Sequence, residues 1–247
     1  MFGGETIEPK QYGRVVITLK PAGSTIAPDY VKNQVSNYLS NYISLPTRVV
    51  IADPDYIYVG VNSTVQYNVT ATTSTSTVII RAIKTNIASF SSTNLEQFNN
   101  DFRYSKFATA IDSSDTSITS NDTEISIIKR ISPLLNYASS YVLYFNNPAY
   151  QEDYTSYSYT PKKDKNKFYD EPVLTSSAFT YVDSNDVKWP LSYIRDDNFG
   201  NVVVYTTVNG VFTVLNYFLG SIDYTTGTVN IKDLKVSDYS KQGYEII

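Results

Sequence analysis

The amino-acid pattern of this chain changes near Pro133, and the change limits the folds that the chain can adopt. Before Pro133, apolar residues recur at strand spacing in some segments and at helical spacing in others. After it, helical spacing fades and short β-rich runs are separated by turn residues. We therefore expect an α+β protein, with a mixed α/β domain over residues 1–135 and a β-rich domain over residues 136–247.

The first domain is expected to have the element order β-α-β-β-α-α-β, with its sheet on one side and its helices on the other. Thr93 and Glu96 form a capping-box pattern, which predicts that a short helix starts there. The expected elements are a strand at Gly13–Leu19, a helix at Val31–Ile43, two strands or one bent strand at Arg48–Val69, helices at Ile79–Phe90 and Ser105–Ile111, and a strand at Ile125–Ile131.

The second domain is expected to be an all-β, sandwich-like module, either a small sandwich or a curled sheet. Asn209-Gly210 lies between two alternating runs, which is a strong signal for a two-residue hairpin turn. The expected strands lie at Tyr137–Asn147, Ala178–Val182, Val202–Val208, Val211–Leu215 and Thr228–Ile231.

Composition excludes several kinds of chemistry. The 247 residues include no Cys and no His, so thiolate sites, disulfides and histidine-based acid–base catalysis are impossible. The formal net charge is −4 and the sequence pI is about 4.9, which argues against non-specific nucleic-acid binding. No apolar run reaches the ~18–20 residues that span a bilayer. We expect no cofactor, no metal, no nucleic acid and no membrane partner.

Acidic residues are the remaining raw material for catalysis, but their local sequence favours turns. Three pairs stand beside Pro, Ser or Gly: Asp53 with Asp55, Asp112 with Asp115, and Asp196 with Asp197. A hydrolase using two carboxylates that are distant in sequence has no supporting motif. We therefore predict that the chain is not an enzyme and has no catalytic residue.

The candidate functional residues are interface residues instead. Tyrosine is abundant, with 23 residues, and it suits both sheet packing and protein contacts. The charged Asp101, Arg103 and Lys106 stand among aromatic residues, which fits either a surface ion pair at a helix corner or a subunit contact. The residues predicted for an interface are Phe102, Arg103, Tyr104, Lys106 and Tyr224.

Three segments resemble one family. Asn99–Lys129 reads NNDFRYSKFATAIDSSDTSITSNDTEISIIK, the opening contains Phe2-Gly3-Gly4-Glu5-Thr6, and Gly220–Ile231 contains a G-x-I-D-Y-x-x-G element. Together they resemble the large wedge subunit of the contractile-tail baseplate in T-even-like bacteriophages. The resemblance implies that residues 1–135 form a baseplate-J-like domain. It also implies that the chain is the C-terminal part of a longer subunit.

The function implied by this resemblance is structural. Copies of the subunit would pair and join with other wedge proteins into a ring around the tail hub, and the ring would rearrange when the sheath contracts. The protein would be assembled in the host cytoplasm and located in the virion. The alternative is a receptor- or glycan-binding tail adhesin module, which the abundant Tyr, Thr, Ser and Asn and the β-rich second half also suit.

Overall fold

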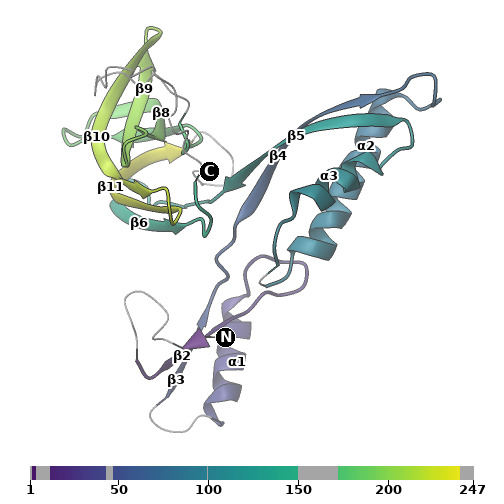
Figure 1. The fold of residues 1–247 in the computed structure, drawn as a ribbon. Helices are drawn as coiled ribbons and strands as arrows, with labels where there is room; N and C mark the ends of the chain where they lie inside the picture. Colours follow the sequence, from purple (N-terminus) through teal and green to yellow (C-terminus); the bar gives the residue numbers. More distant parts are fainter. Residues whose placement is uncertain (1, 4–11, 43–46, 99, 150–171, 240–247) are drawn as a thin grey trace. The chain divides into compact units, whose positions relative to one another are not determined.

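The computed structural model describes residues 2–3, 12–42, 47–98, 100–149 and 172–239 (Figure 1). Helices and strands are both present, and the second half is β-rich, so the predicted α+β class is confirmed. The chain divides into two compact units, Met1–Ile57 and Tyr58–Ile247. The first unit is shorter than the domain expected from the sequence, and the boundary between residues 135 and 136 stays a prediction.

The first unit is a small sheet with one helix. Strands β1 (Phe2–Gly3), β2 (Arg14–Thr18) and β3 (Arg48–Ala52) lie in that order, and α1 (Asp29–Ser40) connects β2 to β3. The β2–β3 pair is parallel, as a crossover helix allows, whereas β1 is antiparallel to β2. Arg14 pairs with Arg48, so two nearly identical sequences, RVVIT and RVVIA, lie side by side in matching register.

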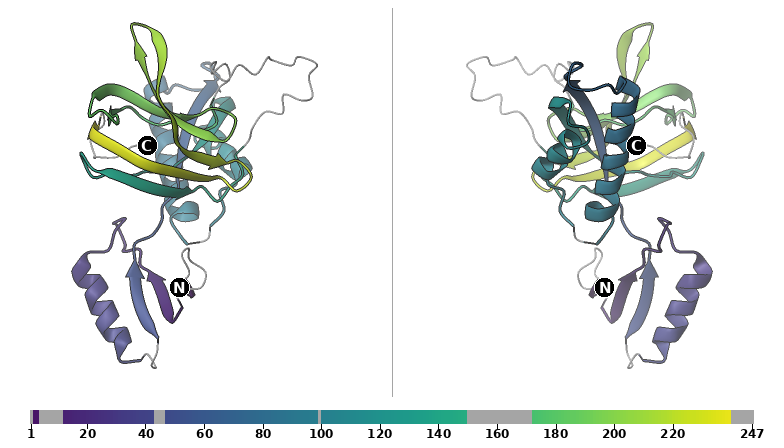
Figure 2. Two further views of the ribbon diagram at one scale, coloured as in Figure 1. Left: turned by 90° about the vertical axis from the view of Figure 1, so that its left-hand side faces the viewer. Right: turned by 90° about the vertical axis from the view of Figure 1, so that its right-hand side faces the viewer.

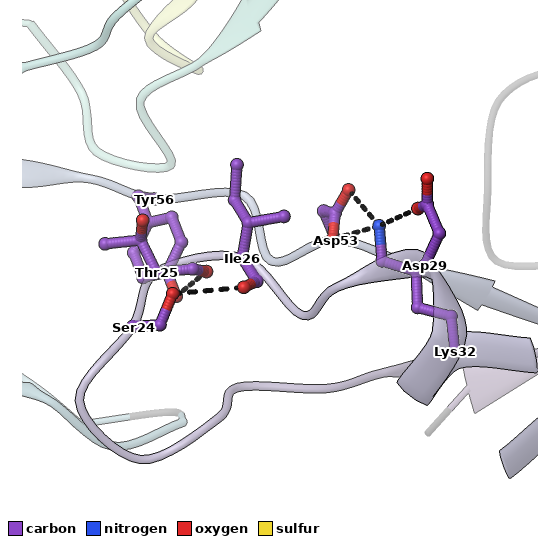
Figure 3. A network of polar contacts seen from close by, with 7 residues as sticks. All are labelled: Ser24, Thr25, Ile26, Asp29, Lys32, Asp53 and Tyr56. Atoms are coloured by element: carbon purple, nitrogen blue, oxygen red, sulfur yellow. Dashed lines mark hydrogen bonds and ion pairs between the residues drawn. The ribbon is translucent and has the colours of Figure 1, made fainter. Parts of the chain in front are cut away.

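Polar contacts hold α1 against the segment that follows β3 (Figure 3). The Lys32 ammonium lies 2.8 Å from the Asp53 carboxylate, whose hydrogen bond raises the pKa of Lys32. The Tyr56 hydroxyl donates to the Thr25 carbonyl oxygen at 2.6 Å. The turn predicted at Asp53-Pro54-Asp55 is absent, because residues 53–57 form an irregular connection, and Asp53 anchors the helix instead.

The Met1–Ile57 unit has a thin core. Among its described residues, only Val16 and Ala27 are buried, and α1 has no buried residue. Because hydrophobic stabilisation follows the apolar area removed from water, this unit gains little from its own packing.

Residues 58–130 form a second α/β module of two antiparallel strands and two helices. Its elements are β4 (Tyr58–Tyr67), α2 (Ser76–Phe90), a π-helical turn (Ser91–Leu95), α3 (Tyr104–Asp112) and β5 (Ile118–Ile128). The helices cover one face of the hairpin (Figure 1). Their buried side chains pack against apolar strand residues and form one core: Ile79, Ile83, Phe107 and Ile111.

The predicted order β-α-β-β-α-α-β matches the observed order from β2 to β5, but three details were wrong. No helix starts at the Thr93–Glu96 capping box, because α2 runs on into the π-helical turn and the Glu96 amide donates to the Ser91 carbonyl at 3.0 Å. Strand β5 starts at Ile118 rather than Ile125, because its polar residues pair with β4. The strands also form two separate sheets instead of one.

The β-rich part is one antiparallel sheet that curls and closes on itself (Figure 2). The strand order is β10-β9-β8-β7-β11-β6, and an additional β10–β11 pairing closes the ring. This architecture is the curled-sheet alternative rather than a two-sheet sandwich. Its strands are β6 (Ala138–Tyr144), β7 (Phe179–Val182), β8 (Lys188–Asp196), β9 (Asn201–Val208), β10 (Val211–Asp223) and β11 (Thr228–Tyr239).

Local turn and proline signals explain which of these strands were predicted from the sequence and which one was missed. Asn209 and Gly210 have φ angles of 51° and 78°, so the predicted hairpin turn between β9 and β10 is confirmed. Strand β8 was missed because it contains Pro190, which argues against a regular strand. The structure accommodates Pro190 at a register irregularity between Trp189 and Ser192, where Leu191 takes a φ of 53°.

The closed sheet, hereafter the barrel, surrounds a dense core. Its buried apolar side chains come from β7 to β11 and from Ile131, and several are completely shielded, among them Val202, Val204, Val229, Leu234 and Val236. This core is distinct from the core of the 58–130 module.

Candidate assembly surface

The start of α3 brings four of the five predicted interface residues together. Arg103 is the N-cap residue, and its carbonyl accepts the Phe107 amide at 3.1 Å. The Phe102 ring lies 5.5 Å from the Phe107 ring, which in turn contacts Phe90 edge-on at 5.4 Å. Phe102 thus anchors this corner to the core of the module.

Tyr104 ties the same corner to β5, because its hydroxyl donates to the Thr123 carbonyl at 3.0 Å while half of its surface stays exposed. Arg103 and Lys106 are exposed. Neither forms an ion pair with Asp101 or with any other described residue. The α3 patch, defined as Phe102, Arg103, Tyr104 and Lys106, therefore presents two unneutralised cations beside aromatic rings.

Tyr224 belongs to the barrel and not to the α3 patch. It is partly buried against the barrel core, and its hydroxyl donates to the Asp196 carboxylate at 2.7 Å. Burial and this hydrogen bond raise the pKa of the Tyr224 phenol well above its ordinary value of 10.0. Asp196 is fully buried and also accepts the Leu174 and Asn198 amides. Tyr224 therefore has a structural role here, and its place in an interface stays a prediction.

Of the predicted acidic pairs, Asp115 and Asp197 accept hydrogen bonds within turns, whereas Asp53 pairs with Lys32 and Asp196 is buried in β8. Asp115 accepts the Ser117 amide at 2.9 Å and the Ser117 hydroxyl at 2.6 Å, and these hydrogen bonds lower its pKa. Asp197 accepts the Phe199 and Asn201 amides within the β8–β9 turn. Among the described residues, no group of three or more acidic side chains could hold a metal ion.

Three exposed apolar surfaces were not foreseen from the sequence. The outer side of α2 carries Val78 and Ile80, with a shallow depression of about 510 Å³ near Arg81 and Lys84. The β9–β10 hairpin exposes Val208 and Val211 at its tip. Strand β6 exposes Val142 and Tyr144. For β6 the sequence did hold a signal, because residues 132–151 contain no charged side chain.

Together these surface features indicate a class of protein. Exposed apolar patches and uncompensated cations on folded α/β and β modules are typical of a component that functions within an assembly. In the described part of the chain, no helix is long and apolar enough to cross a membrane.

A match to a known protein family makes the class of protein more specific. Residues 55–130 match the family model described as baseplate structural protein gp6, C-terminal domain III. The match supports a phage baseplate protein with a structural role in the virion tail, where it interacts with other baseplate proteins. The matched segment coincides with the module from β4 to β5 and contains the α3 patch. No curated protein matches the chain.

Proposed function

We propose that this chain is a wedge subunit of a contractile-tail baseplate. Contacts with copies of itself and with other wedge proteins build the ring around the tail hub and change when the sheath contracts. One observation carries this proposal: the residues that match the baseplate family, 55–130, are those of the β4-α2-α3-β5 module, which has its own core. We propose further that the chain is not an enzyme and that assembly takes place in the host cytoplasm.

The domain assignment belongs to the same proposal. Residues 1–135 act as a baseplate-J-like domain, and residues 136–247 act as a separate β-rich domain. The distinct cores of the 58–130 module and the barrel support a functional boundary near residue 135.

The location is tested by attaching a small epitope to the chain in the phage that encodes it and labelling intact virions for electron microscopy. We expect the label at the baseplate end of the tail, in a ring-like arrangement, and a changed label radius after contraction. Label along the fibres alone, together with binding to a glycan array, would favour the adhesin alternative.

The α3 patch is proposed as one contact of the ring. Reversing the charge of one of its two exposed cations, Arg103→Glu, is expected to remove the chain from complexes with the other wedge proteins. The fold is expected to persist, because the Arg103 side chain makes no capping hydrogen bond. Arg81→Glu is the matched control, since Arg81 is also an exposed cation of this module. Equal co-purification of both variants would exclude the patch as a contact.

A further inference from the structure

The barrel leaves one strand with an unused hydrogen-bonding side. Strand β6 pairs with β11 along one side and stands last in the strand order, so nothing in the described chain pairs with its other side. Figure 2 shows β6 in teal beside β11 in yellow, with no described strand beyond it. A strand with a row of unpaired N–H and C=O groups is a template for another strand.

Natural proteins usually protect such a strand with Lys, Pro, a bulge or a cover. The seven residues of β6, ASSYVLY, include neither a charged residue nor Pro. Its outward positions end in Val142, which is 50% exposed, and Tyr144. Leu134 and Tyr137, just before the strand, are exposed as well. The pairing with β11 is irregular between Ile231 and Leu234, but the extra residue lies on β11, so the free side of β6 remains an uncharged, unprotected edge.

Charge indicates what this strand pairs with. The chain as a whole carries 20 basic and 24 acidic residues, so many of its surface segments are charged. Residues 132–151 carry no charge, so two copies of this segment can approach without like-charge repulsion. An antiparallel pair of identical strands is also compatible with a two-fold axis, which uses the same patch on both subunits.

We propose that β6 is a self-association strand, which pairs antiparallel with β6 of a second copy of this chain. Full overlap of Ala138–Tyr144 places the two-fold axis at Tyr141. Ala138 of one copy then lies opposite Tyr144 of the other, and Ser140 lies opposite Val142. The pairing joins two barrels into one continuous sheet. This inference deepens the proposed function, on which it rests, by naming one of the surfaces through which copies meet.

Another edge strand without charge is β4, which pairs with β5 on one side, and it fits less well. Its outward face is polar, with Asn62, Thr64 and Gln66 exposed. Val61 on β4 still provides a control position, because it is also exposed on an edge strand.

The test is the mass of the purified chain by light scattering across a concentration series. One strand pair is small beside standard interfaces, which bury about 1,200–2,000 Å². We therefore expect the wild-type mass to rise from monomer to dimer with concentration. Val142→Lys places two cations near the axis and is expected to give a monomer throughout. Val211→Lys, at the exposed hairpin tip of the same barrel, and Val61→Lys on β4 are expected to dimerise like wild type.

A second measurement reports the register. Because the chain has no cysteine, a disulfide can form only between introduced residues. We expect a mixture of Ala138→Cys and Tyr144→Cys chains to form a cross-linked heterodimer under mild oxidation. A mixture of Ala138→Cys and Val211→Cys chains should not. Directly opposed strand residues have the Cα separation that a disulfide requires.

Two results would overturn the proposal. The first is a wild-type monomer at every concentration, and the second is a Val142→Lys variant that dimerises normally. Neither result bears on whether the chain is located in the baseplate, which virion labelling decides independently. Loss of dimer only in Val61→Lys would transfer the self-association to β4.

Discussion

The Met1–Ile57 unit and the barrel show two different ways of holding strands together. The first unit has a three-stranded sheet, one helix and only Val16 and Ala27 buried among its described residues. The barrel closes its sheet through the β10–β11 pairing around a core of fully shielded side chains. The difference shows that one chain can combine a module stabilised by its own buried core with a module whose own packing contributes little to its stability. We expect the first unit to open locally at lower free energy than the barrel.

The largest expected effect comes from the closure of the barrel. A methyl group added at Gly220 would lie 1.8 Å from the Asn230 carbonyl oxygen on β11, which is backbone and cannot move aside without separating the strands. Gly220→Ala is therefore expected to cost ~3 kcal/mol or more of unfolding free energy. The measurement is urea denaturation followed by the fluorescence of Trp189, the only tryptophan.

Gly210→Ala is the control for this substitution. Gly210 has a positive φ of 78°, but no atom lies within 4 Å of the added methyl group. The expected cost is only about 1 kcal/mol, from backbone strain alone. Equal stability of the two variants would show that the β10–β11 closure does not hold the barrel together.

The next prediction compares a core substitution in the barrel with one in the Met1–Ile57 unit. Val204→Ala is expected to lower the unfolding free energy of the barrel by about 2–3 kcal/mol, because its buried site cannot fully collapse. Val16→Ala is expected to accelerate amide exchange in β2 and β3 while the barrel amides keep their protection. Hydrogen exchange read by mass spectrometry distinguishes these outcomes. If Val16→Ala also exposed the barrel amides, the two units would unfold cooperatively.

A smaller effect is expected from the buried polar group of the barrel. Tyr224→Phe removes the hydroxyl that donates to the Asp196 carboxylate, and Asp196 is fully buried. We expect a loss of about 1–3 kcal/mol in urea denaturation, because a buried acceptor loses one partner. Tyr205→Phe is the control, since no hydrogen bond of the Tyr205 hydroxyl is present among the described residues. A neutral Tyr224→Phe would mean that water replaces the hydroxyl.

The smallest effect is a titration. Hydrogen bonds from the Trp189 indole and the Val187 amide lower the pKa of Asp183 below its ordinary value of 3.8. A lowered folded-state pKa contributes stability that is present above 3.8 and lost as the pH falls through the folded pKa. We expect Trp189 fluorescence to change with a midpoint below 3.8 and the change to vanish in Asp183→Asn. A midpoint at or above 3.8 would contradict the hydrogen bond.

The parts of the fold that the sequence predicted depend on neighbouring residues. The stripes of α1, α2 and α3 and the Asn209-Gly210 turn are local signals, and the structure contains all four. The missed features depend on distant partners. Closure of the barrel also needs the β7–β11 pairing, in which Val236 lies opposite Tyr181, and β8 tolerates Pro190 because its neighbours absorb an irregular register.

The same distinction applies to the candidate site. The four residues of the α3 patch lie within one short segment, so the sequence alone places them together, and their role in an interface stays a prediction. Tyr224 finds its partner, Asp196, 28 residues earlier in the chain. No local pattern connects these two residues, so the sequence could not reveal that the Tyr224 hydroxyl donates a hydrogen bond to a buried carboxylate of the barrel.

A closed ring of strands with a single additional strand limits the valency of the barrel. Among the described residues, β6 is the barrel strand that stands last in the strand order, and it is the strand through which we propose that the sheet extends to a second copy. Once two copies have used that one connection, no further copy can join through it. Such a linkage ends after one step and cannot grow into a fibre, so any larger assembly of this protein needs a second, chemically different junction.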